Sequence, residues 1–141
     1  MMIGFFIKSS REEGEVFSKY VWAFRNLFKS KIDSTLYSND IDLFLIMYEY
    51  ESKFVEYPAK DFGNVSHRPK EKSASMVVGV KKEFANLSDS GKKEFVISST
   101  FKALEIFEIK AKKKGLDMSR IPKLILDLTE CAEIYRKMNV I

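Results

Sequence analysis

The chain has little of what small catalytic or metal-binding domains commonly use. Its 141 residues include one cysteine, Cys131, and one histidine, His67. A single cysteine cannot close an intramolecular disulfide, and the pair cannot supply the four ligands of a structural zinc site. The sequence also contains no phosphate-binding glycine loop, no dinucleotide-binding glycine motif and no zinc-protease motif. We therefore expect no catalytic residues, no metal, no cofactor and no enzymatic activity.

Proline, glycine and long apolar runs are scarce as well. Three prolines and six glycines argue against a disordered or collagen-like chain. The longest unbroken apolar run, residues 43–48, is far shorter than the roughly 20 residues that a membrane-spanning helix needs. The apolar start, residues 1–7, is too short for a signal peptide and has no basic residue before it. These features, with the lone cysteine, favour a cytoplasmic protein that does not contact a membrane.

What the chain does have is enough apolar material for one domain. Hydrophobic residues make up 45% of the sequence and aromatic residues 13%. A chain of this length buries about two-thirds of the surface that its unfolded form exposes. No repeat or linker divides the sequence, so we expect a single globular domain over residues 1–141.

Charge is distributed unevenly along the chain. Residues 1–72 contain as many acidic as basic residues, so the formal net charge of +4 comes from residues 73–141. The excess lies in three lysine clusters, at positions 81–82, 92–93 and 110–114. These lysines suit solvated helix faces and helix ends, and a nucleic-acid surface would require them to share one face with exposed aromatic residues.

The first half of the sequence predicts strands around one helix. Apolar residues recur at helical spacing over residues 15–28, although the aromatic and β-branched content there also suits a strand. Residues 41–50 are apolar on both alternating sets, as in the central strand of a sheet. Other strands are predicted over residues 2–8, 53–57 and 74–84, and a surface loop over residues 59–73.

The second half predicts two long helices. The first covers residues 88–114, with Ser88 or Ser90 as its cap and Gly115 at its end. The second covers residues 119–138, with Ser119 as its cap. Because their connection is short, the two helices should form an antiparallel hairpin. The predicted fold class is therefore α+β, a two-layer domain in which helices cover a mainly antiparallel sheet.

One part of the sequence collects candidate binding residues. The loop at 59–73 is longer than a simple connector needs, and such loops often carry function. Aromatic and arginine side chains in and beside it are typical interface anchors, and nearby carboxylates could form an acidic patch. The candidate partner-binding residues are Glu49, Glu51, Glu56, Tyr57, Asp61, Phe62, His67 and Arg68. The simpler alternatives are a charged sheet edge for the carboxylates and a solvated loop position for His67.

Two further residues are assigned to the interior. Trp22 and its aromatic neighbours are expected to be core, because large aromatic side chains dominate burial. Cys131 falls on the apolar side of the last helix, where a buried and unreactive thiol is expected.

Four stretches of the sequence carry a family resemblance. Residues 76–80 form a strand that leads through residues 83–88 into a helix whose end spans residues 104–117, and residues 57–63 precede them. This layout resembles small immunity proteins encoded beside bacterial polymorphic or contact-dependent toxins. The resemblance covers about 60 of the 141 residues.

The resemblance implies a cytoplasmic, non-enzymatic protein that binds and neutralises one cognate toxin domain, often a nuclease. Many such proteins are acidic, whereas this chain is basic, so any charge complementarity must be local. Two alternatives remain open. One is a nucleic-acid-binding module that uses the basic C-terminal half, although no nucleic-acid partner is expected on the main hypothesis. The other is a small enzyme with its site in the loop at 59–73.

Overall fold

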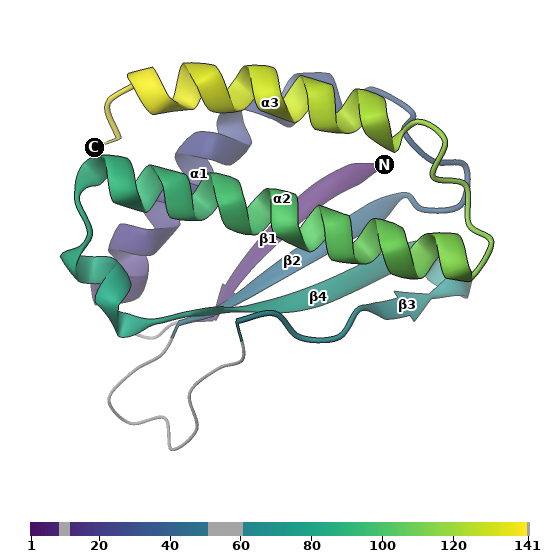
Figure 1. The fold of residues 1–141 in the computed structure, drawn as a ribbon, viewed down its shortest axis with the longest axis horizontal. Coiled ribbons are helices and arrows are strands. Elements are labelled where there is room, and N and C mark those ends of the chain that lie inside the picture. Colours follow the sequence, from purple (N-terminus) through teal and green to yellow (C-terminus); the bar gives the residue numbers. More distant parts are fainter. Residues whose placement is uncertain (9–11, 51–60, 141) are drawn as a thin grey trace.

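The protein folds as a four-stranded sheet with three long helices on the same side of it (Figure 1). The computed structural model describes residues 1–8, 12–50 and 61–140. In chain order the elements are β1 (Met2–Lys8), α1 (Glu12–Asp33), β2 (Leu43–Tyr50), β3 (Ser66–Arg68), η1 (Pro69–Glu71), β4 (Ser73–Val80), η2 (Lys82–Asn86), α2 (Asp89–Lys113) and α3 (Ile121–Lys137). The predicted α+β class with a C-terminal helix pair is confirmed. Within the described ranges, no helix has the length and apolar character needed to cross a membrane.

The direction of the strands differs from the prediction. The sheet order is β1-β2-β4-β3, and both β1 with β2 and β2 with β4 pair in parallel. Among the described strands, only the three-residue β3 runs antiparallel to its neighbour. The expectation of a mainly antiparallel sheet is therefore wrong. For β1 and β2 the reason is α1, whose 22 residues return the chain from the end of β1 to the start of β2, as a parallel crossover requires.

β2 occupies the centre of the sheet, as its apolar sequence predicts, but its two faces are not buried alike. Successive residues alternate between buried and half-buried along the whole strand. The buried set, Phe44, Ile46, Tyr48 and Tyr50, lies under the helices. The other set points to the opposite face, because strand side chains alternate with a period of two. The helices therefore cover one face of the sheet.

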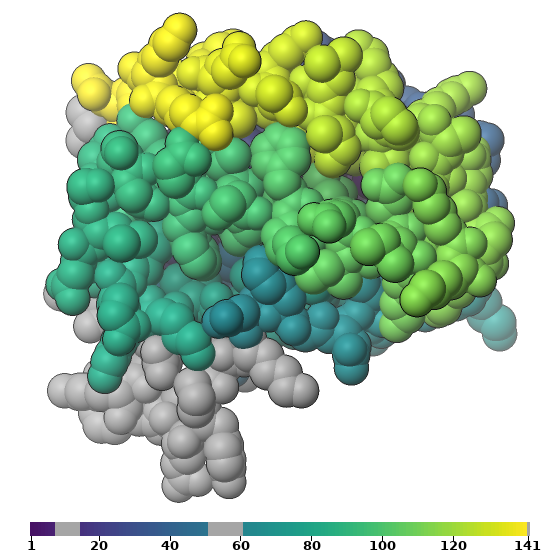
Figure 2. All heavy atoms as spheres, viewed as in Figure 1, coloured from purple at the N-terminus to yellow at the C-terminus, as the bar shows by residue number. Residues whose placement is uncertain are grey.

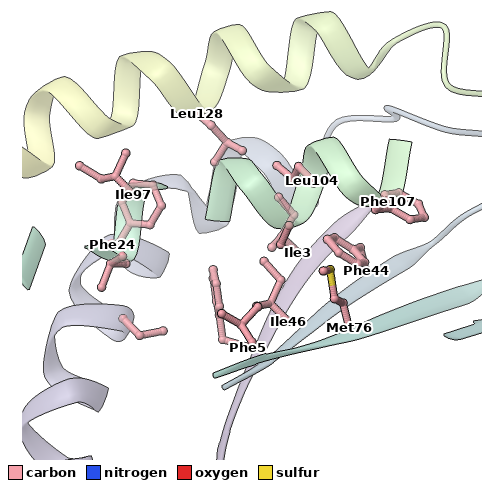
Figure 3. Close-up of a cluster of buried hydrophobic side chains, with 14 of the residues drawn as sticks. Ile3, Phe5, Phe24, Phe44, Ile46, Met76, Ile97, Leu104, Phe107 and Leu128 are labelled. Carbon is pink, nitrogen blue, oxygen red and sulfur yellow. The ribbon is translucent and has the colours of Figure 1, made fainter. Parts of the chain in front are cut away.

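The main core fills the space between the sheet and the helix layer. In Figure 3, side chains from β1, β2 and β4 point toward the helices and meet side chains from α1, α2 and α3. The Phe44 ring stacks on Phe107 of α2 with centroids 4.5 Å apart, and the Phe17 ring of α1 meets Tyr48 edge-on at 4.8 Å. These contacts fix both helices relative to the central strand. Trp22, in contrast, is 45% exposed on α1, so its assignment to the core is wrong.

Some of the residues predicted to begin or end the helices do so in the structure, and one does not. Ser88 caps α2 by accepting a hydrogen bond from the amide of Gly91 at 3.0 Å. Gly115 follows α2 with a φ of +75°, a conformation that favours glycine. Ser119 does not cap α3; its hydroxyl instead donates to Asp117 at 2.6 Å. The turn between α2 and α3 is thus held by an aspartate. The two helices then run antiparallel, as predicted (Figure 1).

The predicted loop at 59–73 and the strands beside it also need correction. From residue 61 onward the segment carries β3 and the short helix η1, so it is not a surface loop there. The predicted strand at 74–84 ends at Val80, and residues 82–86 form η2. The predicted strand at 53–57 lies outside the described residues. In the other direction, α1 is longer than the predicted helix at 15–28.

One buried acid links α3 to the rest of the fold. Asp127 is 1% exposed, accepts a hydrogen bond from the Tyr37 hydroxyl at 2.5 Å and lies 3.0 Å from Lys123 and 3.3 Å from Lys31. Burial alone would raise the pKa of Asp127, but the hydrogen bond from Tyr37 and the two ammonium groups together lower it. Burial and the contact with Asp127 raise the pKa of Tyr37 to about 12. The aspartate is therefore ionised in the folded protein.

We predict that replacing Asp127 with asparagine lowers the free energy of unfolding by roughly 2 kcal/mol at pH 7, the scale for a hydrogen bond to a charged group. Because its folded pKa is depressed, Asp127 stabilises the fold above its unfolded pKa, and this contribution disappears as the pH falls through the folded value. Urea unfolding should therefore show wild type and Asp127→Asn converging below about pH 4. Glu83→Gln, at an exposed position, is the control. A difference independent of pH would contradict the assignment.

Candidate functional site

The structure describes five of the eight candidate residues and places them in three locations. Asp61 and Phe62 lie at the β4 edge of the sheet, below the N-terminal half of α2. His67 and Arg68 belong to β3, toward the C-terminal end of α2. Glu49 is on β2 and points to the face that the helices do not cover. The remaining three, Glu51, Glu56 and Tyr57, lie outside the described residues.

Backbone pairing fixes Phe62 at the sheet edge. Phe62 forms an antiparallel bridge with Val78, the Gly63 amide donates to the carbonyl of Val77 at 2.8 Å, and the Gly79 amide donates to the backbone carbonyl of Asp61 at 3.1 Å. A side chain at position 63 would come within 3.3 Å of the Val77 carbonyl oxygen, so glycine permits this close approach. Residues paired across an antiparallel bridge share a face, and Phe62 thus points toward α2 with Val78.

A hollow of about 410 Å³ opens between this edge and α2. Four residues of α2 face it at positions 95, 98, 99 and 102, the spacing of one helix face. We call it the edge hollow; its lining residues are Asp61, Phe62, Val78, Gly79, Lys81, Phe95, Ser98, Ser99 and Lys102. In Figure 2, the segment around residues 61–68 emerges directly below α2. The volume falls within the range of sites that accept a small molecule or a large side chain.

The base of the edge hollow is anchored to the protein core. Ser99 is 3% exposed, and its hydroxyl shares a 2.6 Å hydrogen bond with the hydroxyl of Tyr48. Burial raises the pKa of Tyr48, so this pair is uncharged at neutral pH. Phe62 and Phe95, both half-buried, supply aromatic surface around that base. The hollow thus combines apolar walls with a rigid, neutral base.

The charged residues of the edge hollow are mostly basic. Lys81 and Lys102 lie among its lining residues with Asp61, which is exposed. The Lys102 ammonium group is 3.5 Å from Glu105, one turn along α2, and both side chains are more than half exposed. An exposed pair of this kind contributes little to stability and leaves the lysine able to approach a partner.

His67 and Arg68 contribute to a separate basic region. The Lys110 ammonium group donates to the carbonyl of Val65, which ties α2 to the segment before β3. Burial lowers the pKa of His67, and Lys114 and Lys110 lower it further against the opposing effect of Asp40. Arg68 is exposed, and its guanidinium lies 3.7 Å from Glu71. The lysine run at the end of α2 therefore lies beside β3, a proximity that the linear sequence does not show.

Glu49 does not join Phe62. In the register of β2 with β4, Glu49 lies opposite Gly79, and its side chain points away from the helices. The predicted combination of carboxylates with the aromatic anchors is thus not formed by Glu49. Sequence reasoning also missed Phe95, Ser98 and Lys102, which line the hollow. The helical spacing of these three was the available signal, but it identifies a face of α2 without showing what that face meets.

Comparisons with known proteins add no further information on this site. Neither the family descriptions of proteins, nor curated proteins, nor solved structures contain a match to the chain. Within the part of the chain that the structure describes, no cluster of three or more histidine, cysteine, aspartate or glutamate residues could hold a metal ion. Cys131 is buried, and burial raises the pKa of its thiol, as expected of an unreactive position.

We predict that Phe62 and Phe44 differ sharply in their contribution to stability. Phe44 is fully buried, so Phe44→Ala should lower the free energy of unfolding by about 3 to 5 kcal/mol. Phe62 is half-buried beside open space, so Phe62→Ala should cost roughly 1 kcal/mol. Urea denaturation of the two variants measures both values. A cost for Phe62→Ala as large as that of Phe44→Ala would show that Phe62 is a core residue and not an available anchor.

Proposed function

We propose that the chain is a non-enzymatic immunity protein that binds and neutralises a cognate bacterial toxin domain through the edge hollow. The observation that carries this proposal is the hollow itself, which presents two phenylalanine rings on rigid elements. Interfaces concentrate their binding energy in a few well-packed pockets and anchors, and aromatic residues are enriched among them. The sequence resemblance of residues 57–63 and 76–117 to immunity proteins supports the same function.

Rigid support is what distinguishes this surface from an ordinary surface depression. The Ser99–Tyr48 hydrogen bond ties its base to the central strand, and the Gly63–Val77 hydrogen bond ties Phe62 to β4. A site that is already formed does not require ordering when the partner arrives, so more of the contact energy appears as affinity. Inhibition of a toxin demands such affinity and needs no chemistry from the inhibitor.

The charges of the hollow define the expected partner segment. Lys81 and Lys102 would favour an apolar side chain of the toxin that is flanked by a carboxylate. The expected attraction is thus between lysines of the hollow and an acidic group of the toxin, and not between Glu49 and a basic group of the toxin. Because the action of such a protein is to meet its toxin in the cell, we also propose that it works in the cytoplasm, where the buried Cys131 remains reduced.

We predict that a neighbouring reading frame encodes the toxin, as the variable C-terminal domain of a long secreted protein, and that the present protein binds this domain. Phe62→Ala and Lys102→Glu should each weaken binding at least tenfold in isothermal titration calorimetry, because they remove a wall and invert a charge of the hollow. The matched controls are Ile134→Ala and Lys29→Glu, exposed residues on α3 and α1. Co-expression with the toxin domain should protect growth with the wild type and the controls.

Three results would contradict this proposal. The first is that the wild type neither binds nor protects against the neighbouring toxin domain. The second is that both hollow variants bind as tightly as the wild type, which would place the interface elsewhere. The third is that the purified protein itself turns over nucleic acid or peptide, with activity lost in His67→Ala, which would favour an enzyme.

A second candidate function is nucleic-acid binding by the basic region beside β3. The observation in its favour is that the lysines at the end of α2 approach His67. Against it, several cations of this region lie near carboxylates, as Lys112 does 2.8 Å from Glu108 and Lys72 does 3.6 Å from Asp42. Such pairs reduce the net positive potential that would attract phosphates.

Filter binding at increasing salt tests the nucleic-acid candidate. A protein that contacts about six phosphates should lose roughly 10³-fold in affinity between 50 and 200 mM salt. We expect the present protein to show weak binding without preference among sequences, and no change when Lys113 and Lys114 are replaced by glutamine. A steep salt dependence that these replacements reduce would favour the nucleic-acid function over the immunity function.

A further inference from the structure

The face of the sheet opposite the helices is apolar over β1 and most of β2, whereas polar residues on it include Glu49, Ser73 and Ser75. Along β1, Phe6 is 55% exposed and Met2 is 42% exposed, both on this side. We call this surface the open face; its apolar residues are Met2, Phe6, Leu43, Leu45, Met47 and Val77. Contiguous exposed apolar surface is uncommon on a protein that remains alone in solution. Among the described elements, every long helix lies on the other face (Figure 1).

The strand that borders the open face is also an edge strand. β1 pairs with β2 on one side and ends the order of the described sheet. α1 packs over β1 and against α2 and α3, and its Phe17 reaches Tyr48 of β2, so α1 lies on the helix side of the sheet. Edge strands of stable monomers are commonly protected by a charge, a proline, a bulge or a short length. β1 is seven residues long, has no proline, and carries no charge before Lys8.

We propose that β1 pairs with β1 of a second copy of this chain, antiparallel across a twofold axis. The product is a continuous eight-stranded sheet, a size within the normal range, with all helices on one face and both open faces joined on the other. A symmetric contact requires a surface that complements itself, and the uncharged stretch of β1 meets this requirement. The proposal does not depend on the immunity function, because the edge hollow lies at the opposite side of the sheet.

The distribution of residues along β1 selects a register. Centring the axis on Gly4 places Met2 opposite Phe6 of the second copy, and Phe6 opposite its Met2, on the open face. In this register position 8 falls beyond the residues that pair with the second copy. At Gly4 itself, the methyl groups of Leu43 and Leu45 lie 3.2 and 3.1 Å from the position that a side chain would take. The two leucines of β2 thus continue the apolar surface up to Gly4, which adds no side chain at the axis.

The distribution of charge also favours pairing with a second copy of the chain at the β1 edge. The basic region beside β3 belongs to the opposite edge of the sheet. In the eight-stranded sheet the two β3 strands would lie about seven strand spacings apart, roughly 34 Å at 4.8 Å per spacing. The Debye length at physiological ionic strength is about 8 Å, so the two basic edges would hardly repel each other. Association through any other strand edge would bring them closer together.

The experiment is the solution mass of the protein and of matched variants. Analytical ultracentrifugation at 100 µM should give about twice the chain mass of 16.4 kDa for the wild type. Phe6→Lys places a charge in the proposed interface at an exposed position and should weaken association at least tenfold. Ile134→Lys, at 57% exposure on α3, is the matched control and should remain dimeric. Circular dichroism establishes that both variants are folded.

A cysteine pair tests the register. In a Cys131→Ala background, Met2→Cys combined with Phe6→Cys should form an intermolecular disulfide under mild oxidation, whereas Phe6→Cys alone should cross-link far less. A monomeric wild type overturns the proposal and leaves the β1 edge to a different partner. A wild-type dimer whose association Phe6→Lys does not weaken overturns it as well. Equal cross-linking by the single and double variants overturns the register. Phe6→Lys should bind the toxin domain as the wild type does, so failure here and failure of the immunity function remain distinguishable.

Discussion

The side chain of Tyr48 connects every layer of this fold. Its ring stacks at 6.2 Å on Phe5 of β1 and meets Phe17 of α1 at 4.8 Å, and its hydroxyl bonds to Ser99 of α2 at 2.6 Å. A tyrosine suits this position because its ring packs among apolar groups while its hydroxyl finds a buried polar partner. This hydrogen bond and the stacking of Phe107 on Phe44 together fix the rotation of α2 about its own axis. Residues 95, 98 and 102 then face the sheet edge, and the edge hollow exists because of this rotation.

The one-sided arrangement of helices has a second consequence. A sheet covered on one face must either be polar on the other or find a partner for it. On the uncovered face, the part of the sheet formed by β1 and β2 is mostly apolar. The part formed by β4 is more polar, because Ser73 and Ser75 lie there. The two edges of the sheet therefore differ in chemistry. One is apolar and uncharged, and the other carries the hollow and the lysines.

The sequence predicted the elements of the fold better than their arrangement. Helical spacing predicted all three long helices, and stretches of apolar, β-forming residues predicted β1, β2 and β4, because these signals depend on neighbours along the chain. Strand direction depends on how α1 packs, and nothing local distinguishes a parallel from an antiparallel neighbour at β2. The assignment of Trp22 failed for a related reason. The size of Trp22 favours burial. However, Phe17 and Phe24 occupy the face of α1 that is turned toward the core, and Trp22 lies on the outer side of that helix.

Two residues of the edge hollow, Asp61 and Phe62, were among the candidates from the sequence, and their role in binding stays a prediction. They lie at the sheet edge because Phe62 pairs with Val78 of β4. The grouping of Glu49 with them failed because the face to which a strand residue points is fixed by register, and a shift of one residue reverses it. The contribution of α2 could not be predicted, since it requires knowing which helix face meets residue 62. A site assembled from two distant segments is therefore only half visible in the sequence.

The electrostatic behaviour of the edge hollow follows from the same arrangement. Its base is the neutral Ser99–Tyr48 pair, and burial raises the pKa of Tyr48, so the base does not ionise near neutral pH. Its basic groups are the lysines at positions 81 and 102. His67, whose pKa is lowered, belongs to the other basic region under the end of α2. Binding at the hollow should therefore respond to salt, which screens exposed charges, much more than to pH between 6 and 8.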